Sequence, residues 1–221
     1  MKASFTIFAN CKAYFFNNKL VALTFDDGPN VGTTDRILDV LKKYNAKATF
    51  FCVGCKVNSK TSDILNRIIE EGSEIGNHSN NFKPALTEMT AAEILSEYNI
   101  TQQKIYEITG IYPKVFRAPG LQASDAAFEN IPLPFFGGYS KASDWSDTVL
   151  LEARINNIKN SVADGRVVLL HDVSLNVEAL EATIPDLIKE GYTFVTVSEL
   201  YKLRGYNPTS DTKIQYKEFN K

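Results

Sequence analysis

Short apolar runs rich in Val, Phe and Thr alternate along the chain with longer segments whose apolar residues recur every three to four positions. The short runs predict strands, and the periodic segments predict amphipathic helices. Strands are expected at Lys19–Phe25, Ala46–Val53, Glu74–Asn77, Lys114–Arg117, Phe135–Tyr139, Arg166–Leu170 and Tyr192–Val197. Helices are expected at 34–44, 62–72, 90–110, 150–162 and 177–191. This alternation predicts an α/β fold built on a parallel sheet or barrel.

Start and stop signals agree with these helix boundaries. Thr90 followed by Glu93 is typical of a capping box, in which each residue satisfies a free amide of the other. Gly72, Gly110 and Gly191 stand where helices should end, since glycine accepts the left-handed conformation of a helix C-terminus. The helical segments are therefore marked by chemistry as well as by periodicity.

Composition is that of one packed domain. The 221 residues include 24 Lys plus Arg against 26 Asp plus Glu, which leaves a net charge of −2, and 44% of the residues are hydrophobic. Proteins that hold nucleic acid through its phosphates need a basic surface, so a nucleic-acid partner is not expected. No apolar run approaches the ~18 residues of a membrane span. Without a linker or repeat, we expect a single domain over residues 1–221.

The first eighteen residues have two separate predictions attached to them. Asn17-Asn18 between two apolar runs indicates a short N-terminal β-hairpin over residues 1–18. The same segment lacks the long apolar core and small-residue cleavage site of a secretory signal, so it is interpreted as the start of the domain.

Three cysteines, Cys11, Cys52 and Cys55, cannot all pair with one another, so no disulfide framework is implied. Cys52-Val-Gly-Cys55 has the spacing of a redox or zinc pair. The surrounding run, ATFFCVGCKV, is instead typical of a buried strand, and no second pair follows it. The interpretation favoured here is that these cysteines are small buried hydrophobes.

Polar residues with catalytic potential follow the predicted strands, where the carboxyl ends of parallel strands gather their loops. They are Asp26 and Asp27, His78, Arg117, Asp144 with Trp145, and His171. Both histidines of the chain stand at such strand ends. Such a constellation rarely arises by chance and predicts an active site at this edge.

Asp26 and Asp27 offer two carboxylates for different tasks. Adjacent residues leaving a strand point to opposite sides, so one can ligate a divalent cation while the other takes a proton from water. The alternative is a solvated Asp-Asp-Gly turn. His78 is a candidate metal ligand, with a hydrogen-bonded structural histidine as its alternative. Because no second His follows it, a metal here would have few protein ligands and several waters, and Co, Mg, Mn or Zn would suit it.

His171 has the ordinary pKa of a proton donor to a leaving group, near ~6.5. Asp144 is expected to hold its other ring nitrogen, and Arg117 to pair with Asp26 and keep that carboxylate ionised. An ordinary salt bridge is the alternative for Arg117. Trp145 and Leu169 are expected to wall a small apolar pocket, with plain core packing as the alternative.

Five segments, VALTFDDGPN, EIGNHS, VFRAPG, SDWSD and VVLLHDV, resemble in order and spacing the five motifs of the polysaccharide deacetylases, carbohydrate esterase family 4 or the NodB homology domain. The resemblance implies a distorted (β/α) barrel, with a catalytic core over 19–205 and a C-terminal tail over 206–221. It implies these roles: Asp26 general base, Asp27 and His78 metal ligands, Arg117 tether of the base, Asp144 partner of the acid, His171 general acid, and Trp145 and Leu169 wall of the acetyl pocket.

Two positions depart from the family pattern. Phe82 stands where the second motif usually closes with a second metal histidine, and Gly120 replaces the aromatic residue whose backbone N–H helps to hold the oxyanion. Glycine still offers its N–H, so Gly120 or the backbone near Gly28 is expected in that role.

In departing from the family pattern in this way, the sequence resembles the clostridial-type acetylxylan esterases, in which one Asp, one His and waters hold the metal. The resemblance therefore implies hydrolysis of O-acetyl groups on xylan by a divalent-metal enzyme. Alternatives are an N-deacetylase of chitin oligomers or peptidoglycan, and a carbohydrate-binding pseudoenzyme. An extracellular location, suited to a polymer substrate, and a monomeric state are expected.

Overall fold

The computed structural model describes residues 19–140, 144–146 and 148–214. Its strands are β1 (Lys19–Gly28), β2 (Ala48–Cys52), β3 (Glu74–Asn77), β4 (Phe135–Phe136), β5 (Arg166–His171), β6 (Tyr192–Phe194) and β7 (Lys213–Ile214). Its helices are α2 (Thr34–Lys43), α3 (Ser62–Glu70), α4 (Ala91–Thr109), α5 (Asp125–Asn130), α6 (Leu151–Ser161), α7 (Ser174–Lys189) and α8 (Val197–Leu203).

All strand pairs within the described residues are parallel. The main sheet has the order β3-β2-β1-β5, and β6 pairs with the start of β1. Three isolated bridges join the remaining segments: Asn77 pairs with Phe116, Phe116 with Phe135, and Tyr139 with Val168 of β5. The strands therefore surround a barrel interior, and the side between β3 and β5 is held mostly by isolated bridges. The distorted (β/α) barrel expected from the sequence is confirmed.

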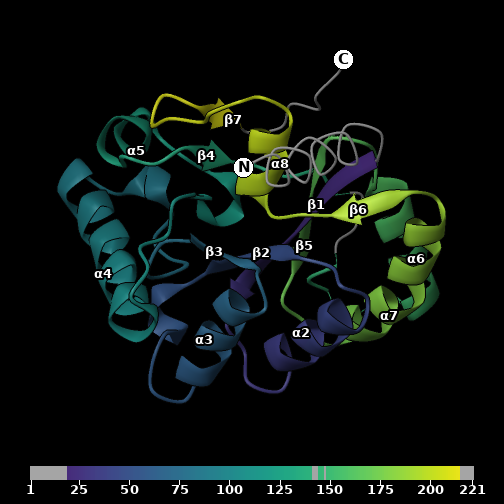
Figure 1. Cartoon of the computed structure of the whole chain (residues 1–221). Helices are drawn as coiled ribbons and strands as arrows, with labels where there is room; N and C mark the ends of the chain where they lie inside the picture. The colour runs from purple at the N-terminus through teal and green to yellow at the C-terminus, as the bar shows by residue number, and fades with distance from the viewer. Residues whose placement is uncertain (1–18, 141–143, 147, 215–221) are drawn as a thin grey trace, which may run out of the picture.

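Helices α4, α3, α2, α7 and α6 follow one another around the outside of the strands (Figure 1). Strand β1 is buried on both faces, as a strand between helices and barrel interior must be. Its residues Val21, Leu23 and Phe25 belong to the core beneath the helices, whereas Leu20 and Ala22 belong to a second cluster with residues of β4 and α8. Since side chains alternate along a strand, Thr24 and Asp26 continue the inward-facing row.

Four predicted strands are shorter than expected, and the one over 46–53 is confined to Ala48–Cys52. Residues 114–117 pair with their neighbours only through two isolated bridges at Phe116, one to Asn77 and one to Phe135. The predicted strand over 135–139 ends at Phe136, since the next carbonyl, of Gly137, accepts a hydrogen bond from Arg117 instead. The predicted strand over 192–197 ends at Phe194, because Thr196 caps α8.

The five predicted helices are present within a few residues of their expected bounds. Thr90 and Glu93 form the predicted capping box of α4, and Gly110 ends that helix in the left-handed conformation with φ 69°. Helices α5 and α8 were not predicted; both are shorter than eight residues, too short for their periodicity to stand out.

The cysteine prediction is half right. Cys52 is fully buried in β2, but Cys55 is exposed, because the strand ends before it and a 3-10 turn begins at Gly54.

The predicted N-terminal hairpin and Cys11 lie outside the described residues. Among the described helices, none has both the length and the apolarity to cross a membrane. Within the expected tail, β7 pairs with β4.

Candidate active site

The carboxyl ends of the strands surround an open cavity of about 610 Å³. All of the predicted cavity-facing residues line it: Asp26, Asp27, His78, Gly120, Trp145, Leu169 and His171. Phe82, Lys83, Ala85, Glu88, Pro119, Leu121 and Gln122 complete the lining. Arg117 and Asp144 lie behind this surface, nearly inaccessible to solvent, and contact Asp26 and His171 respectively.

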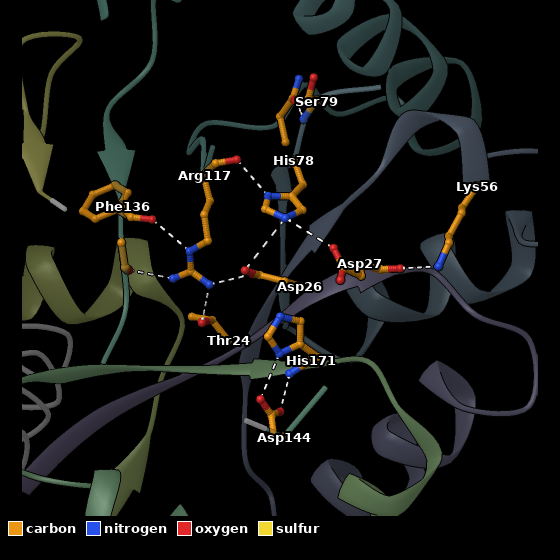
Figure 2. Close-up of polar contacts among 12 residues, drawn as sticks. Thr24, Asp26, Asp27, Lys56, His78, Ser79, Arg117, Phe136, Asp144 and His171 are labelled. Carbon is orange, nitrogen blue, oxygen red and sulfur yellow. Dashed lines mark hydrogen bonds and ion pairs between the residues drawn. The ribbon is translucent and has the colours of Figure 1, made fainter. Parts of the chain in front are cut away.

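The two neighbouring aspartates point to the same place, which corrects the expectation that they diverge. His78 Nε2 lies 3.8 Å from Asp26 Oδ2 and 3.5 Å from Asp27 Oδ1, as Figure 2 shows. The register of β1 shifts between Asp26 and Gly28, and Asp27 has a left-handed φ of 72°. This bulge cancels the strand alternation and turns the second carboxylate back toward the first. Lys56 Nζ holds the strained turn by donating to the Asp27 carbonyl at 2.7 Å.

The protonation of His78 follows from its partners. Its Nδ1 lies 2.8 Å from the carbonyl oxygen of Arg117, and since a carbonyl only accepts, Nδ1 carries the hydrogen. In the neutral ring, Nε2 then presents a lone pair toward two carboxylates. Three acceptors facing one another need a cation between them, a proton or a metal ion. Asp27 and His78 therefore fit a divalent metal with oxygen and nitrogen ligands.

This site would be sparsely liganded. No group of three or more His, Cys, Asp or Glu side chains arranged for a metal occurs in the part of the chain that the structure describes. Phe82, at the position where the family pattern has a histidine, lines the cavity 41% exposed and has no ligating atom in its side chain. Burial opposes ionisation of Asp27, but His78, His171 and Lys56 together hold the pKa of its carboxyl below the usual value.

Arg117 fixes the first aspartate from behind. Its fully buried guanidinium donates to Asp26 Oδ1 and to Thr24 Oγ1, both at 2.7 Å, and to the carbonyls of Phe136 at 2.9 Å and Gly137 at 2.7 Å (Figure 2). The predicted contact between Arg117 and Asp26 is present. With Oδ1 held, Asp26 Oδ2 is left facing His78 and the cavity.

His171 ends β5 with its ring held by Asp144. Nδ1 lies 2.9 Å from Asp144 Oδ1, and the backbone N–H of His171 donates to Asp144 Oδ2 at 2.6 Å. Nδ1 therefore carries a hydrogen, and Nε2 is left for the cavity (Figure 2). Burial disfavours the charged ring, but the hydrogen bond and charge of Asp144, with the charges of Asp26 and Asp27, raise the pKa of His171.

Sequence reasoning missed the residues behind this pair. Asn176 and Arg154, on α7 and α6, contact Asp144, and nothing in their local sequence distinguishes them from other helix residues. Asp172 is buried next to His171 and accepts a hydrogen bond from Thr34 Oγ1. Burial raises the pKa of the Asp172 carboxyl to about 6.

Comparison with known proteins decides the family. The family described as polysaccharide deacetylase matches residues 15–131, more than half of the chain. The chain belongs to the polysaccharide deacetylase family. The deacetylase fold seen here superposes on a family 4 acetyl xylan esterase from Clostridium thermocellum, in complex with a cobalt ion, with a TM-score of 0.87 and 42% identity. The match covers 92% of this chain and all of that one.

Two curated relatives of this deacetylase domain are much longer proteins. A bifunctional xylanase/deacetylase from Pseudobutyrivibrio xylanivorans is 42% identical over 90% of this chain and 33% of its own length. A peptidoglycan-N-acetylmuramic acid deacetylase from Bacillus subtilis is 36% identical over 85% of this chain and 40% of its own length. The chain thus spans between a third and two-fifths of these two relatives.

Proposed function

We propose that this deacetylase domain is a divalent-metal carbohydrate esterase that hydrolyses O-acetyl groups on xylan. The observation that carries the proposal is the convergence of three pairs on one open cavity: Asp26 with Arg117, Asp27 with His78, and His171 with Asp144. A tethered carboxylate, a cation site and a held imidazole are the parts needed to activate water, stabilise an oxyanion and protonate a leaving group.

Asp26 is the general base. Arg117 occupies Oδ1, so the proton of an attacking water goes to Oδ2, the oxygen on the cavity side. The buried guanidinium prevents the carboxylate from rotating, because its other hydrogens are committed to three further oxygens. Asp26 is thus ready to accept a proton without reorganisation.

Asp27 and His78 would hold the metal ion, with water in the remaining positions. When bound, a divalent cation polarises an acetyl carbonyl and lowers the pKa of a bound water. The Arg117 carbonyl, by fixing the hydrogen on Nδ1, keeps His78 Nε2 available as the ligating atom. Cobalt, zinc, magnesium and manganese all suit so few protein ligands.

His171 is the general acid. Asp144 holds Nδ1 and stabilises the imidazolium, so the proton leaves from Nε2 to the departing sugar oxygen. The raised pKa of His171 favours the protonated ring, the form that an acid needs. The Gly120 N–H is the backbone donor proposed for the oxyanion, and Trp145 and Leu169 enclose the acetyl methyl; all three line the cavity.

Xylan is favoured as the substrate because the deacetylase relative from P. xylanivorans and the C. thermocellum structure are named for xylan chemistry. An alkoxide also leaves more readily than an amine, so a loosely held metal suffices for an ester. The open cavity suits a polymer, and we propose that the enzyme acts on it outside the cell. We propose a monomer, with no nucleic-acid partner.

A second candidate is an N-deacetylase of peptidoglycan, favoured by the B. subtilis relative, or of chitin oligomers. A pseudoenzyme that only binds carbohydrate is less consistent with the site, since binding needs neither a tethered base nor a held acid. These alternatives share the fold, so only substrate comparison separates them.

The test is acetate release from acetylxylan, chitin oligomers and peptidoglycan, measured side by side after metal removal and after adding Co²⁺, Mg²⁺, Mn²⁺ or Zn²⁺. We expect metal-restored release selective for acetylxylan, abolished in Asp26→Ala and unchanged in the exposed control Asp63→Ala. Comparable release from chitin oligomers would refute the xylan preference. Release that survives exhaustive chelation would remove the metal from the mechanism.

A further inference from the structure

Two fully buried polar side chains, Arg154 of α6 and Asn176 of α7, stand behind the Asp144–His171 pair. Arg154 Nη1 donates to Asn176 Oδ1 at 3.1 Å. Asn176 Nδ2 donates to Asp144 Oδ2 at 2.7 Å and to the His171 carbonyl at 2.8 Å. A continuous chain of hydrogen bonds therefore runs from the guanidinium through the amide and the carboxylate to the imidazole.

The direction of the Asn176 amide is fixed by its neighbours. A guanidinium only donates, so the amide oxygen must face Arg154. Nδ2 must then face the Asp144 carboxylate and the His171 carbonyl, both of which only accept. The flipped amide would oppose donor to donor and acceptor to acceptor in a site without solvent. Arg154 thereby determines which end of Asn176 meets Asp144.

The same guanidinium holds the turn that carries Trp145. Arg154 donates from Nη1 to the Asp144 carbonyl, from Nη2 to the Ser146 carbonyl at 2.5 Å, and from Nε to the Val149 carbonyl at 2.9 Å. Trp145, 64% exposed at the cavity, lies between two of these carbonyls. One side chain therefore fixes the backbone on both sides of the proposed acetyl-pocket wall.

We propose that Arg154 and Asn176 are positioning residues of this site: Arg154 orients the Asn176 amide and the Trp145 turn, and Asn176 holds the Asp144 carboxylate and offsets part of its charge. The proposal rests on the proposed function only where it names His171 as the acid. Neither residue faces the cavity, so both act through Asp144 and the turn.

The effect on His171 has a definite sign. The charged groups acting on its ring are Asp144, Asp26 and Asp27, and burial acts against them. Without the Asn176 donor, Asp144 remains held by the N–H and Nδ1 of His171, at 2.6 and 2.9 Å, but its charge is less offset. The carboxylate then favours the imidazolium more strongly. We expect the pKa of His171 to rise by about 0.5–1 unit, a fraction of what a charge-assisted hydrogen bond is worth.

The test is a nuclear magnetic resonance titration of the histidine rings in the full chain, with and without added Zn²⁺. The chain has two histidines, so the His171 signal is assigned by its loss in His171→Gln. Asn176→Ala removes the donor. Asn176→Asp keeps the shape but turns an oxygen toward Asp144, so a larger upward shift is expected. Asn156→Ala, on the exposed face of α6, is the matched control and should leave the titration unchanged.

The alkaline limb of the pH–rate profile for acetate release should move with the His171 titration. Arg154→Lys, which keeps the charge but loses the planar fork, should shift the pKa in the same direction, and its effect should not add to that of Asn176→Ala. An unchanged or lowered His171 pKa in the Asn176 variants would overturn the proposal. If Arg154→Lys does not fold, the titrations of the Asn176 variants are sufficient to decide it. If no substrate releases acetate, the proposed function fails, while the titration still decides the role of Asn176.

Discussion

Replacement of Arg117 by Met is the sharpest test of how the base is held. The guanidinium is fully buried and donates to Asp26, Thr24, and the carbonyls of Phe136 and Gly137. Methionine has a similar length but no donor, so the variant leaves a buried carboxylate without its cation. Breaking a buried pair in this way costs about 3–5 kcal/mol, which corresponds to a loss of about 6–20 °C in melting temperature for a domain of this size.

A double-mutant cycle isolates the pair from the rest of the network. Stability is measured by urea unfolding for Arg117→Met, Asp26→Asn and the double variant. We expect a coupling energy of about 2–3 kcal/mol, because the charge of Asp26 is costly only when Arg117 is missing.

Arg67→Met is the control, because Arg67 pairs with Asp39 and Glu71 near the surface. A pair of that kind contributes about 0–1 kcal/mol.

Acetate release by Arg117→Met should fall about 100-fold at a temperature where the variant is folded, as expected when a base is displaced by about 1 Å. Additive effects within about 0.5 kcal/mol in the double-mutant cycle would refute the reasoning.

Three further outcomes follow from the site. His171→Gln should reduce acetate release about 10²–10⁴-fold. The pKa of His171 is raised in the folded chain, so protonated His171 stabilises the fold below the ordinary pKa of 6.5, and this stability is lost as the pH rises through the folded pKa. The free energy of unfolding of the variant, measured in urea, should therefore change less with pH on the alkaline side. Burial raises the pKa of Asp172 to about 6, so the folded chain binds that proton more tightly than the unfolded chain and stability falls from about pH 4 to pH 6; Asp172→Asn should remove this slope, and an unchanged slope would contradict the assignment. His78→Ala and Asp27→Asn should each weaken Zn²⁺ binding in calorimetry by at least about tenfold, while Asp63→Ala should bind Zn²⁺ as tightly as the unaltered chain.

The sequence was informative wherever a short segment carries its own signal. The five main helices follow from apolar spacing, and the bounds of α4 follow from Thr90, Glu93 and Gly110. The α/β alternation and the strand-end position of the polar residues were sufficient to place the site on one edge of a parallel sheet. The motif resemblance then indicated the family, which the comparisons show.

Tertiary structure decided how the site residues meet. Alternation along a strand predicts that Asp26 and Asp27 diverge, and only the bulge against β2, with its left-handed Asp27, brings both carboxylates toward His78. Nor does local sequence show that Arg154 and Asn176 support the Asp144–His171 pair. Periodicity records which side of an element is buried, which is a local property of the chain. The direction of a buried polar side chain depends on partners supplied by distant elements, 91 residues away for Asp26 and Arg117, and is settled only when the ring of strands closes.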